Sequence, residues 1–342
     1  MRIDKASGTP TLRARYHGAL LGLAAGDALG TTLEFTRPGT FAPITDMIGG
    51  GPFRLAPGQW TDDTSMALCL AESLIECRGF EAADQMRRYR RWRDEGYWSS
   101  TGRCFDIGNT VAGALNRFID TGDPFAGATD PHTAGNGSLM RLAPIPLAFA
   151  RDPVAAVEQA GRMSRTTHGA AEAVDACRYY AGLLIGALQG VEKPVLLAPH
   201  FAPVGVDWNQ TPLAPAIATI AAGSFKERHP PVIRGTGYVV QALEAALWAF
   251  HTSDTFADGA LKAVNLGEDA DTTGAIYGQL AGAYYGVAAI PESWRARLTH
   301  AEAIARLADE LLELAGLEVG AARLGSAVRT TDTPSRSVCN DA

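Results

Sequence analysis

The chain of 342 residues has few cysteines and no pattern that would use them. There are five, an odd number, and no two form a CxxC pair, so we expect neither a disulfide framework nor a zinc site of the usual spacing. Unpaired thiols are typical of a reducing compartment, and we expect a cytoplasmic protein. The cysteines are Cys69, Cys77, Cys104, Cys177 and Cys339.

Positive charge is also in short supply. The net charge is −7, whereas a nucleic-acid surface needs a basic face, so no nucleic-acid partner is expected. Residues 1–5 lead into polar sequence rather than an apolar run, so no signal peptide is expected. Residues 272–290 are uncharged and carry a glycine every four residues, as packed membrane helices do. They are only modestly apolar and follow a cluster of acids, so we expect a buried core helix and no integral membrane segment.

Strict alternation of β-branched residues is almost absent, whereas apolar residues recur at helical spacing. One helical stripe lies within residues 174–184, and others lie within 240–250 and 304–314. A further helix is predicted over 65–77. The sequence therefore predicts a compact all-α protein. No clean linker interrupts it, so we expect one domain over 11–316, followed by a polar, partly disordered tail over 317–342.

Two predicted helices carry glycines along one face. Each glycine costs about 1 kcal/mol relative to alanine inside a helix, so we expect both helices to be central and closely packed against neighbours, which could include each other. Such packing would hold Asp27, Glu34 and the acidic turn at 268–273 in one region. The glycines are Gly18, Gly22, Gly26 and Gly30 in the first helix, and Gly274, Gly278, Gly282 and Gly286 in the second.

Two acidic turns each open an apolar helical run. They are Thr61-Asp62-Asp63-Thr64 and Glu268-Asp269-Ala270-Asp271-Thr272-Thr273. Helix capping is one reading, because Asp and Thr are favoured in a first turn. Two clusters denser than a cap requires favour instead an oxygen cage for one or two Mg²⁺ or Mn²⁺ ions. An EF-hand is excluded, because Leu280 stands where that loop needs a bidentate Glu.

Other motifs are weaker when taken singly. The turn at 135–141 has two glycines that would let its backbone approach a phosphate, although such turns are also common without a ligand. Asp106 and Glu34 lie in apolar company, where an acid is paired, metal-bound or a general acid/base. His168 is either a ligand contact or merely hydrogen-bonded, and Tyr238 is either a contact or plain core. Residues 36–59 are predicted to form a long mobile connection.

Taken together, these motifs resemble the ADP-ribosylglycohydrolase family, and most closely its bacterial dinitrogenase reductase-activating branch. The likeness runs from about Tyr16 to about Leu314. Seven motifs in the right order carry it: Gly26-Asp27-Ala28-Leu29-Gly30 with Glu34, Gly58-Gln59-Trp60-Thr61-Asp62-Asp63-Thr64, Cys104-Phe105-Asp106-Ile107-Gly108-Asn109, Gly135-Asn136-Gly137-Ser138-Leu139-Met140-Arg141, Ser164-Arg165-Thr166-Thr167-His168-Gly169, Gly237-Tyr238-Val239 and Gly267-Glu268-Asp269-Ala270-Asp271-Thr272.

The resemblance implies an orthogonal multi-helix bundle with two divalent cations, Mg²⁺ or Mn²⁺. It implies Glu34 as a mobile acid beside the metals and Asp106 as the acid facing the scissile ribose. The implied metal ligands are Thr61, Asp62, Asp63, Asp269, Asp271 and Thr272. The implied ADP-ribose contacts are Asn109, Gly135, Asn136, Gly137, Ser138, Leu139, Met140, His168 and Tyr238.

The function that follows is hydrolysis of the N-glycosidic bond between ADP-ribose and arginine on a modified protein. Three alternatives stay open at this point. The enzyme could act on serine-linked or O-acetyl ADP-ribose, the chain could be an immunity protein that neutralises an ADP-ribosylating toxin, or it could be a generic metal-dependent phosphohydrolase. The expected partners are an ADP-ribosylated protein and ADP-ribose itself.

Overall fold

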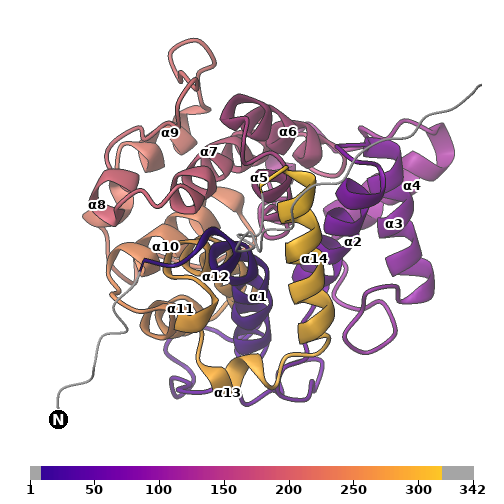
Figure 1. Ribbon diagram of the computed structural model, residues 1–342. Coiled ribbons are helices and arrows are strands. Elements are labelled where there is room, and N and C mark those ends of the chain that lie inside the picture. Colours follow the sequence, from indigo (N-terminus) through magenta and orange to yellow (C-terminus); the bar gives the residue numbers. More distant parts are fainter. Residues whose placement is uncertain (1–8, 318–342) are drawn as a thin grey trace, which may run out of the picture.

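A computed structural model describes residues 9–317. Within that range the chain forms α-helices, three short 3-10 helices and isolated β-bridges, with no β-strand, so the all-α prediction is confirmed (Figure 1). The α-helices are α1 (Leu12–Gly30), α2 (Asp62–Glu76), α3 (Ala82–Glu95), α4 (Asn109–Thr121), α5 (Pro144–Ala148), α6 (Pro153–Arg165), α7 (Ala171–Leu188), α8 (Lys193–Leu196), α9 (Pro215–Ala221), α10 (Val239–His251), α11 (Phe256–Val264), α12 (Ala270–Tyr285), α13 (Glu292–Arg295) and α14 (Ala301–Leu314). The 3-10 helices are η1 (Pro131–Thr133), η2 (Ser224–Lys226) and η3 (Val287–Ala289).

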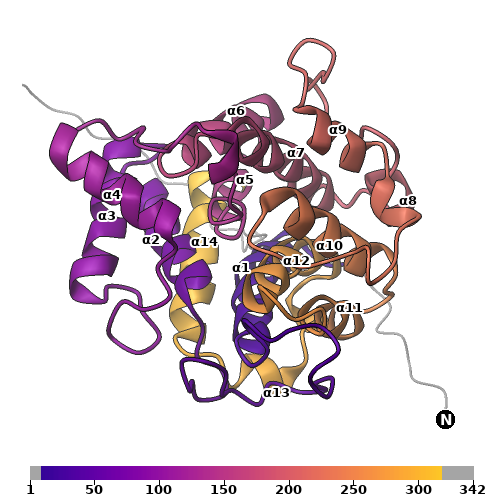
Figure 2. The same ribbon diagram turned by 180° about the vertical axis from the view of Figure 1, so that it is seen from behind.

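Helices α1 and α12 lie in the middle of the molecule and run antiparallel with their glycine faces in contact (Figure 1 and Figure 2). A Cβ atom on Gly18 would lie 2.1 Å from the carbonyl oxygen of Gly282, and one on Gly26 would lie 2.0 Å from that of Gly274. No side chain fits at such distances, so glycine is required on both helices. The prediction of two close-packed central helices is confirmed. We call this contact between the glycine faces the glycine seam. It ends where Gly30, the last residue of α1, meets Ala270, the first residue of α12, so the C-terminus of α1 lies beside the N-terminus of α12.

The other helices surround this pair with their predicted apolar stripes inward. Val174, Cys177 and Leu184 of α7 are buried, as are Leu243 of α10 and Ile304 of α14. Two boundaries differ from the predictions. Helix α2 begins at Asp62 rather than at residue 65, because the acids themselves form its first turn. The predicted core helix over 272–290 ends at Tyr285, since Gly286 adopts a positive φ of 76°.

Residues 36–59 are irregular, as predicted, but much of the segment is fixed to the helices around it. The side chain of Asn265 bonds both backbone groups of Ile44, at 2.8 and 3.0 Å. Asp46 accepts hydrogen bonds from Trp294 at 2.7 Å and from Arg297 at 2.9 Å. The prediction of a mobile connection therefore does not extend to this anchored part.

Two further expectations concern the ends of the chain and the membrane. The predicted tail over 317–342 falls, after residue 317, outside the described residues. No helix between residues 9 and 317 combines the length and the apolar character needed to cross a bilayer.

Candidate metal centre and ligand cavity

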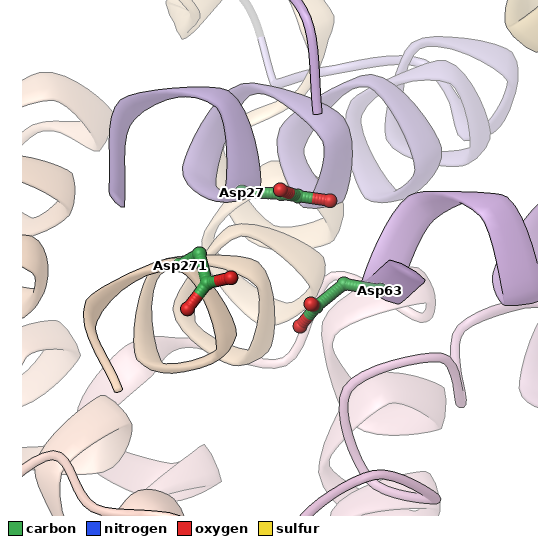
Figure 3. A group of neighbouring side chains, drawn as sticks. All are labelled: Asp27, Asp63 and Asp271. Carbon is green, nitrogen blue, oxygen red and sulfur yellow. The ribbon is translucent and has the colours of Figure 1, made fainter. Parts of the chain in front are cut away.

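Three aspartates from three helices meet where the glycine seam ends. Asp27 of α1, Asp63 of α2 and Asp271 of α12 point toward one another (Figure 3), with one carboxylate oxygen of each within 4.8 Å of the others. A second group, Glu34, Asp106 and Asp271, meets the same condition. Asp271 belongs to both groups, so the two sets of acids adjoin. The folding that the glycine seam imposes thus brings together acids far apart in the sequence.

Both carboxylate oxygens of Asp27 already accept hydrogen bonds from protein groups. Its Oδ1 accepts hydrogen bonds from the backbone N–H and the hydroxyl of Thr61, both at 2.9 Å. Its Oδ2 accepts from the N–H and the hydroxyl of Thr64, at 3.1 and 2.6 Å. Asp27 therefore caps the N-terminus of α2 from the neighbouring helix and orients Thr61. The sequence pattern predicts Asp27 in this region but not its role, because the cap joins two helices that are distant in the sequence.

Other carboxylates of the cluster lack partners. Asp63 Oδ1, Asp271 Oδ1 and Glu34 Oε2 are buried, and none has a hydrogen-bond partner among the described residues. The hydroxyl of Thr61 lies 3.0 Å from Asp63 Oδ2 and 3.2 Å from Asp271 Oδ2, but it has one proton, for which Asp27 competes. Buried carboxylates without partners are costly unless a proton or a cation lies between them. The oxygen-only set of donors fits a hard divalent cation.

The burial and close spacing of these acids raise their pKa values. Burial, reinforced by Asp106, raises the pKa of Glu34 to about 10. Burial likewise raises the pKa of Asp106 to about 7 and that of Asp27 to about 6. The pKa values of three further acids are raised, first by burial and then by neighbouring carboxylates: Asp62, Asp63 and Asp271. A bound cation would reverse these shifts, because it favours the ionised forms.

A cavity of about 680 Å³ opens onto the acids, within the range typical of small-molecule sites. It brings together most of the predicted site residues. Those that line it are Glu34, Asp62, Asp106, Asn109, Gly135, Asn136, Gly137, Met140, His168, Asp269, Asp271 and Thr272. Thr61 and Asp63 are fully buried and do not line it.

The glycine turn lines the cavity through Gly135, Asn136, Gly137 and Met140. Asn136 ties the turn to the acidic centre, since its side-chain amide donates to Asp269 Oδ2 at 2.7 Å. The next two backbone N–H groups, of Gly137 and Ser138, donate no hydrogen bond within residues 9–317. Free consecutive N–H groups form a nest for an anion. Ser138 and Leu139 are buried and do not line the cavity, so Gly137 is the residue that brings a free N–H group to it, and the predicted ligand contacts of Ser138 and Leu139 stay predictions.

His168 lies against this turn in a defined state. The buried guanidinium of Arg141 donates to the hydroxyl of Thr167 at 2.6 Å, and we assign the proton of that hydroxyl to His168 Nδ1, 2.8 Å away, because it has no other acceptor among the described residues. Burial and the charge of Arg141 lower the pKa of His168 to about 3. The imidazole is therefore neutral with its proton on Nε2. A Cβ on Gly135 would lie 3.3 Å from that nitrogen, so this N–H faces the glycine turn.

Tyr238 does not line this cavity. Its ring is 39% exposed, and its hydroxyl bonds Glu172 at 2.6 Å. It borders an adjacent hollow of about 590 Å³ that shares Thr110, Gly135 and Gly237 with the main cavity. Its predicted role as an ADP-ribose contact stays a prediction, one that requires a ligand reaching into this second hollow.

The fold and the site define an all-helical protein with an oxygen-only acidic centre beside an anion-binding turn. A family model described as ADP-ribosylglycohydrolase matches residues 8–319, and the chain belongs to this family. The predicted resemblance and the hydrolase class that it implies are thereby confirmed.

Three relatives and one solved structure extend this result. The chain is 45% identical over 301 residues to "ADP-ribosylarginine hydrolase Tri1" of Pseudomonas putida, covering 88% of this chain and 78% of the relative. For the Serratia proteamaculans protein of the same name, identity is 42% over 298 residues, with 87% and 79% covered. "ADP-ribosyl-[dinitrogen reductase] glycohydrolase" of Rhodospirillum rubrum is 34% identical over 318 residues, with 90% and 99% covered. A structure titled "ADP-ribosylglycohydrolase-related protein complex" is 46% identical, with a TM-score of 0.77, covering 89% of this chain and 99% of that one.

Proposed function

We propose that this protein hydrolyses the N-glycosidic bond between ADP-ribose and an arginine side chain of a modified protein, and so reverses mono-ADP-ribosylation. The observation that carries the proposal is the pairing, in one cavity, of unpartnered acids with a glycine turn in which Gly137 presents a free N–H group. A diphosphate would bind the turn while the sugar faces the acids. The printed names of the relatives from Pseudomonas, Serratia and Rhodospirillum support the same reaction class.

The acids would hold two divalent cations, Mg²⁺ or Mn²⁺. When bound, such cations orient and activate water and stabilise developing negative charge. The residues proposed to hold them are Thr61, Asp62, Asp63, Asp269, Asp271 and Thr272. Asp27 supports this set indirectly, because it fixes the backbone and hydroxyl of Thr61.

Glu34 and Asp106 are proposed to move the protons of the reaction. Water adds to the anomeric carbon as the bond to the guanidino nitrogen breaks, so one proton must leave the water and one must reach that nitrogen. Carboxyl oxygens of the two residues lie within 4.8 Å of each other, close enough to share a proton. Without metal, burial raises the pKa of both carboxyls, and their mutual hydrogen bond raises that of Glu34 and lowers that of Asp106, so Glu34 is the one that holds the proton.

The proposed role of Asp106 in proton transfer predicts how Asp106→Asn should behave. The amide keeps the shape of the side chain, so ADP-ribose should bind with little change in calorimetry. Hydrolysis should slow about a hundredfold, the usual scale for a lost acid or base. Lost binding or unaltered turnover would remove Asp106 from this role.

The diphosphate is proposed to lie on the glycine turn, where it would accept hydrogen bonds from the N–H of Gly137 and from Nε2–H of His168. The neutral imidazole donates without adding charge, and the positive charge of Arg141 stands behind it. An acidic chain can bind an anion here because these donors are local.

The direct test compares peptides that carry ADP-ribose on arginine with peptides that carry it on serine, each with Mg²⁺ or Mn²⁺ and with EDTA. Mass spectrometry should find free ADP-ribose and unmodified arginine peptide, and only with metal. Asp271→Asn should abolish the release, whereas Asp258→Asn, at an exposed acid on α11, should not. Cleavage of the serine peptide alone would assign the other linkage, and release of AMP would indicate a phosphohydrolase.

The domain and the compartment also remain proposals. We propose that residues 11–316 form the catalytic domain, because α1 and α14 pack together from its two ends. A cytoplasmic location is proposed on the cysteine argument, since Cys69, Cys77, Cys104 and Cys177 are free.

A further inference from the structure

Phe35 has an unusual position for a large apolar residue. It follows Glu34 directly, lines the cavity, and is 69% exposed. Its φ is 58°, in the left-handed region that bulky residues rarely adopt. Both exposure and conformation are unfavourable for the free protein, and such strained residues cluster at functional sites.

The strained conformation is held by a short backbone ladder. The N–H of Phe35 donates to the carbonyl of Glu268 at 2.6 Å, and the N–H of Glu268 donates to the carbonyl of Thr36 at 2.8 Å. Glu268 has a positive φ as well, 57°. The ladder thus joins the backbone beside Glu34 to the backbone beside Asp269.

Phe35 begins a row of three aromatic rings, which we call the aromatic rim: Phe35, Phe53 and Phe105. Ring centroids of Phe35 and Phe53 lie 6.4 Å apart, and those of Phe53 and Phe105 lie 5.1 Å apart. Phe105 directly precedes Asp106. The aromatic rim therefore connects the segments that carry the two proposed proton-transfer residues.

The charge that lines the cavity is of one sign. Among the described residues, no lysine or arginine lines the cavity, whereas Glu34, Asp62, Asp106 and Glu268 do. Arg234 does not line the cavity and is paired with Glu268. Aromatic faces beside carboxylates suit a planar, delocalised cation, which is the chemistry of a guanidinium.

We propose that Phe35, the member of the aromatic rim that lines the cavity, binds the guanidinium of the arginine that leaves ADP-ribose. This inference rests on the proposed function and deepens it. Phe35 would be a specificity-determining residue for the leaving group, while ADP-ribose is held by the glycine turn and by the acidic centre.

The test uses the full chain with Phe35→Leu, Phe35→Gly and Phe35→Trp. Loss of the aromatic face in the Leu and Gly variants should lower kcat/KM on an ADP-ribosylarginine peptide by between about twofold and thirtyfold, the range of a cation–π contact. Inhibition by agmatine, a free guanidine probe, should weaken by the same factor. Phe35→Trp should retain both, since it keeps an aromatic face.

Two measurements separate this role from a structural one. ADP-ribose, which lacks the guanidinium, should bind all variants within about twofold. Phe35→Gly should not lower the melting temperature, because glycine adopts a positive φ without strain. Phe125→Leu, at an exposed phenylalanine that does not line the cavity, is the matched control and should behave as the wild type.

The outcomes are distinguishable. If the wild type releases no arginine peptide, the proposed function fails. If the wild type is active but Phe35→Leu leaves both kcat/KM and agmatine inhibition unchanged, only the aromatic rim is refuted. Equal losses of agmatine and ADP-ribose binding would also refute it, because they would indicate a general distortion of the cavity.

Discussion

Replacing Asp271 with asparagine should change the stability of the protein in opposite directions with and without metal. Asp271 is fully buried, belongs to both groups of acids, and leaves Oδ1 unpaired. Without a cation, this carboxyl destabilises the folded state through repulsion from the neighbouring acids, and an amide of the same shape removes that repulsion. With a cation, the same substitution deletes a charged ligand. The metal-free variant should therefore be more stable than the wild type, and the metal-loaded variant less stable.

The magnitude follows from the geometry. Carboxylate oxygens within 4.8 Å of each other, at an effective dielectric constant of about 20, repel by about 3.5 kcal/mol per ionised pair. The alternative is to keep Asp271 protonated. For a group whose ordinary pKa is 3.8, that costs about 5 kcal/mol at about pH 7.5. We expect the metal-free variant to gain about 3 kcal/mol. With about 2.1 cal/mol/K of unfolding entropy per residue over 342 residues, the melting temperature should rise by about 4 °C.

The assay is thermal unfolding after EDTA treatment, repeated with saturating Mg²⁺ or Mn²⁺. Asp27→Asn is the matched control, because Asp27 is equally buried but accepts four hydrogen bonds from Thr61 and Thr64. An amide nitrogen cannot accept two of them, so this variant should lose stability in both conditions. If Asp271→Asn is less stable than the wild type even without metal, the repulsion argument is wrong.

Three further results are expected. Because burial raises the pKa of Asp106 from 3.8 to about 7, the folded metal-free protein binds a proton that the unfolded chain has released. Its melting temperature should therefore fall as the pH rises from about 4 to about 7, and metal should flatten or reverse this slope. Gly26→Ala would place a Cβ 2.0 Å from a backbone oxygen of α12 and should cost about 3 kcal/mol or more in denaturant unfolding, whereas Gly113→Ala, whose nearest contact is at 3.4 Å, should stabilise by about 0.5–1 kcal/mol. Thr167→Val removes the hydroxyl that holds the proton of His168 on Nε2, so the ring ¹⁵N chemical shifts of His168 should change. ADP-ribose binding should weaken about tenfold, the scale of one hydrogen bond of about 1.4 kcal/mol. Unchanged ¹⁵N shifts would refute the tautomer assignment.

The parts of the fold that the sequence predicts best are those in which one residue type has no substitute. Glycine every four residues on two helices admits few explanations, and the structure places Gly18 and Gly282 in backbone contact. The acidic turns can also be recognised from the sequence, because they contain more acids, among them Asp62, Asp63 and Asp271, than a helix cap requires. Local patterns therefore identify both the central helices and the acids that they bring together.

Features that depend on contacts between distant segments were not predicted. Asp27 is one acid in an apolar helix, and only the position of α2 makes it a cap. The tautomer of His168 requires Arg141 and Thr167 to meet it in space. The anchoring of residues 36–59 depends on Asn265 and Trp294, more than two hundred residues along the chain. None of these pairings leaves a periodic pattern in the sequence.

The charge of the site explains why its acids converge on the starts of two helices. Helices α2 and α12 begin at Asp62 and Ala270, so the positive ends of both dipoles face the carboxylates. Each helix end supplies only about half an elementary positive charge. The acids that line the cavity or adjoin it are more numerous: Glu34, Asp106, Asp27, Asp62, Asp63, Asp269 and Asp271. Protons can neutralise some of these groups, but a proton held by a metal ligand prevents that ligand from binding a cation. Under the proposed function, the missing positive charge is that of two divalent cations and of the arriving guanidinium.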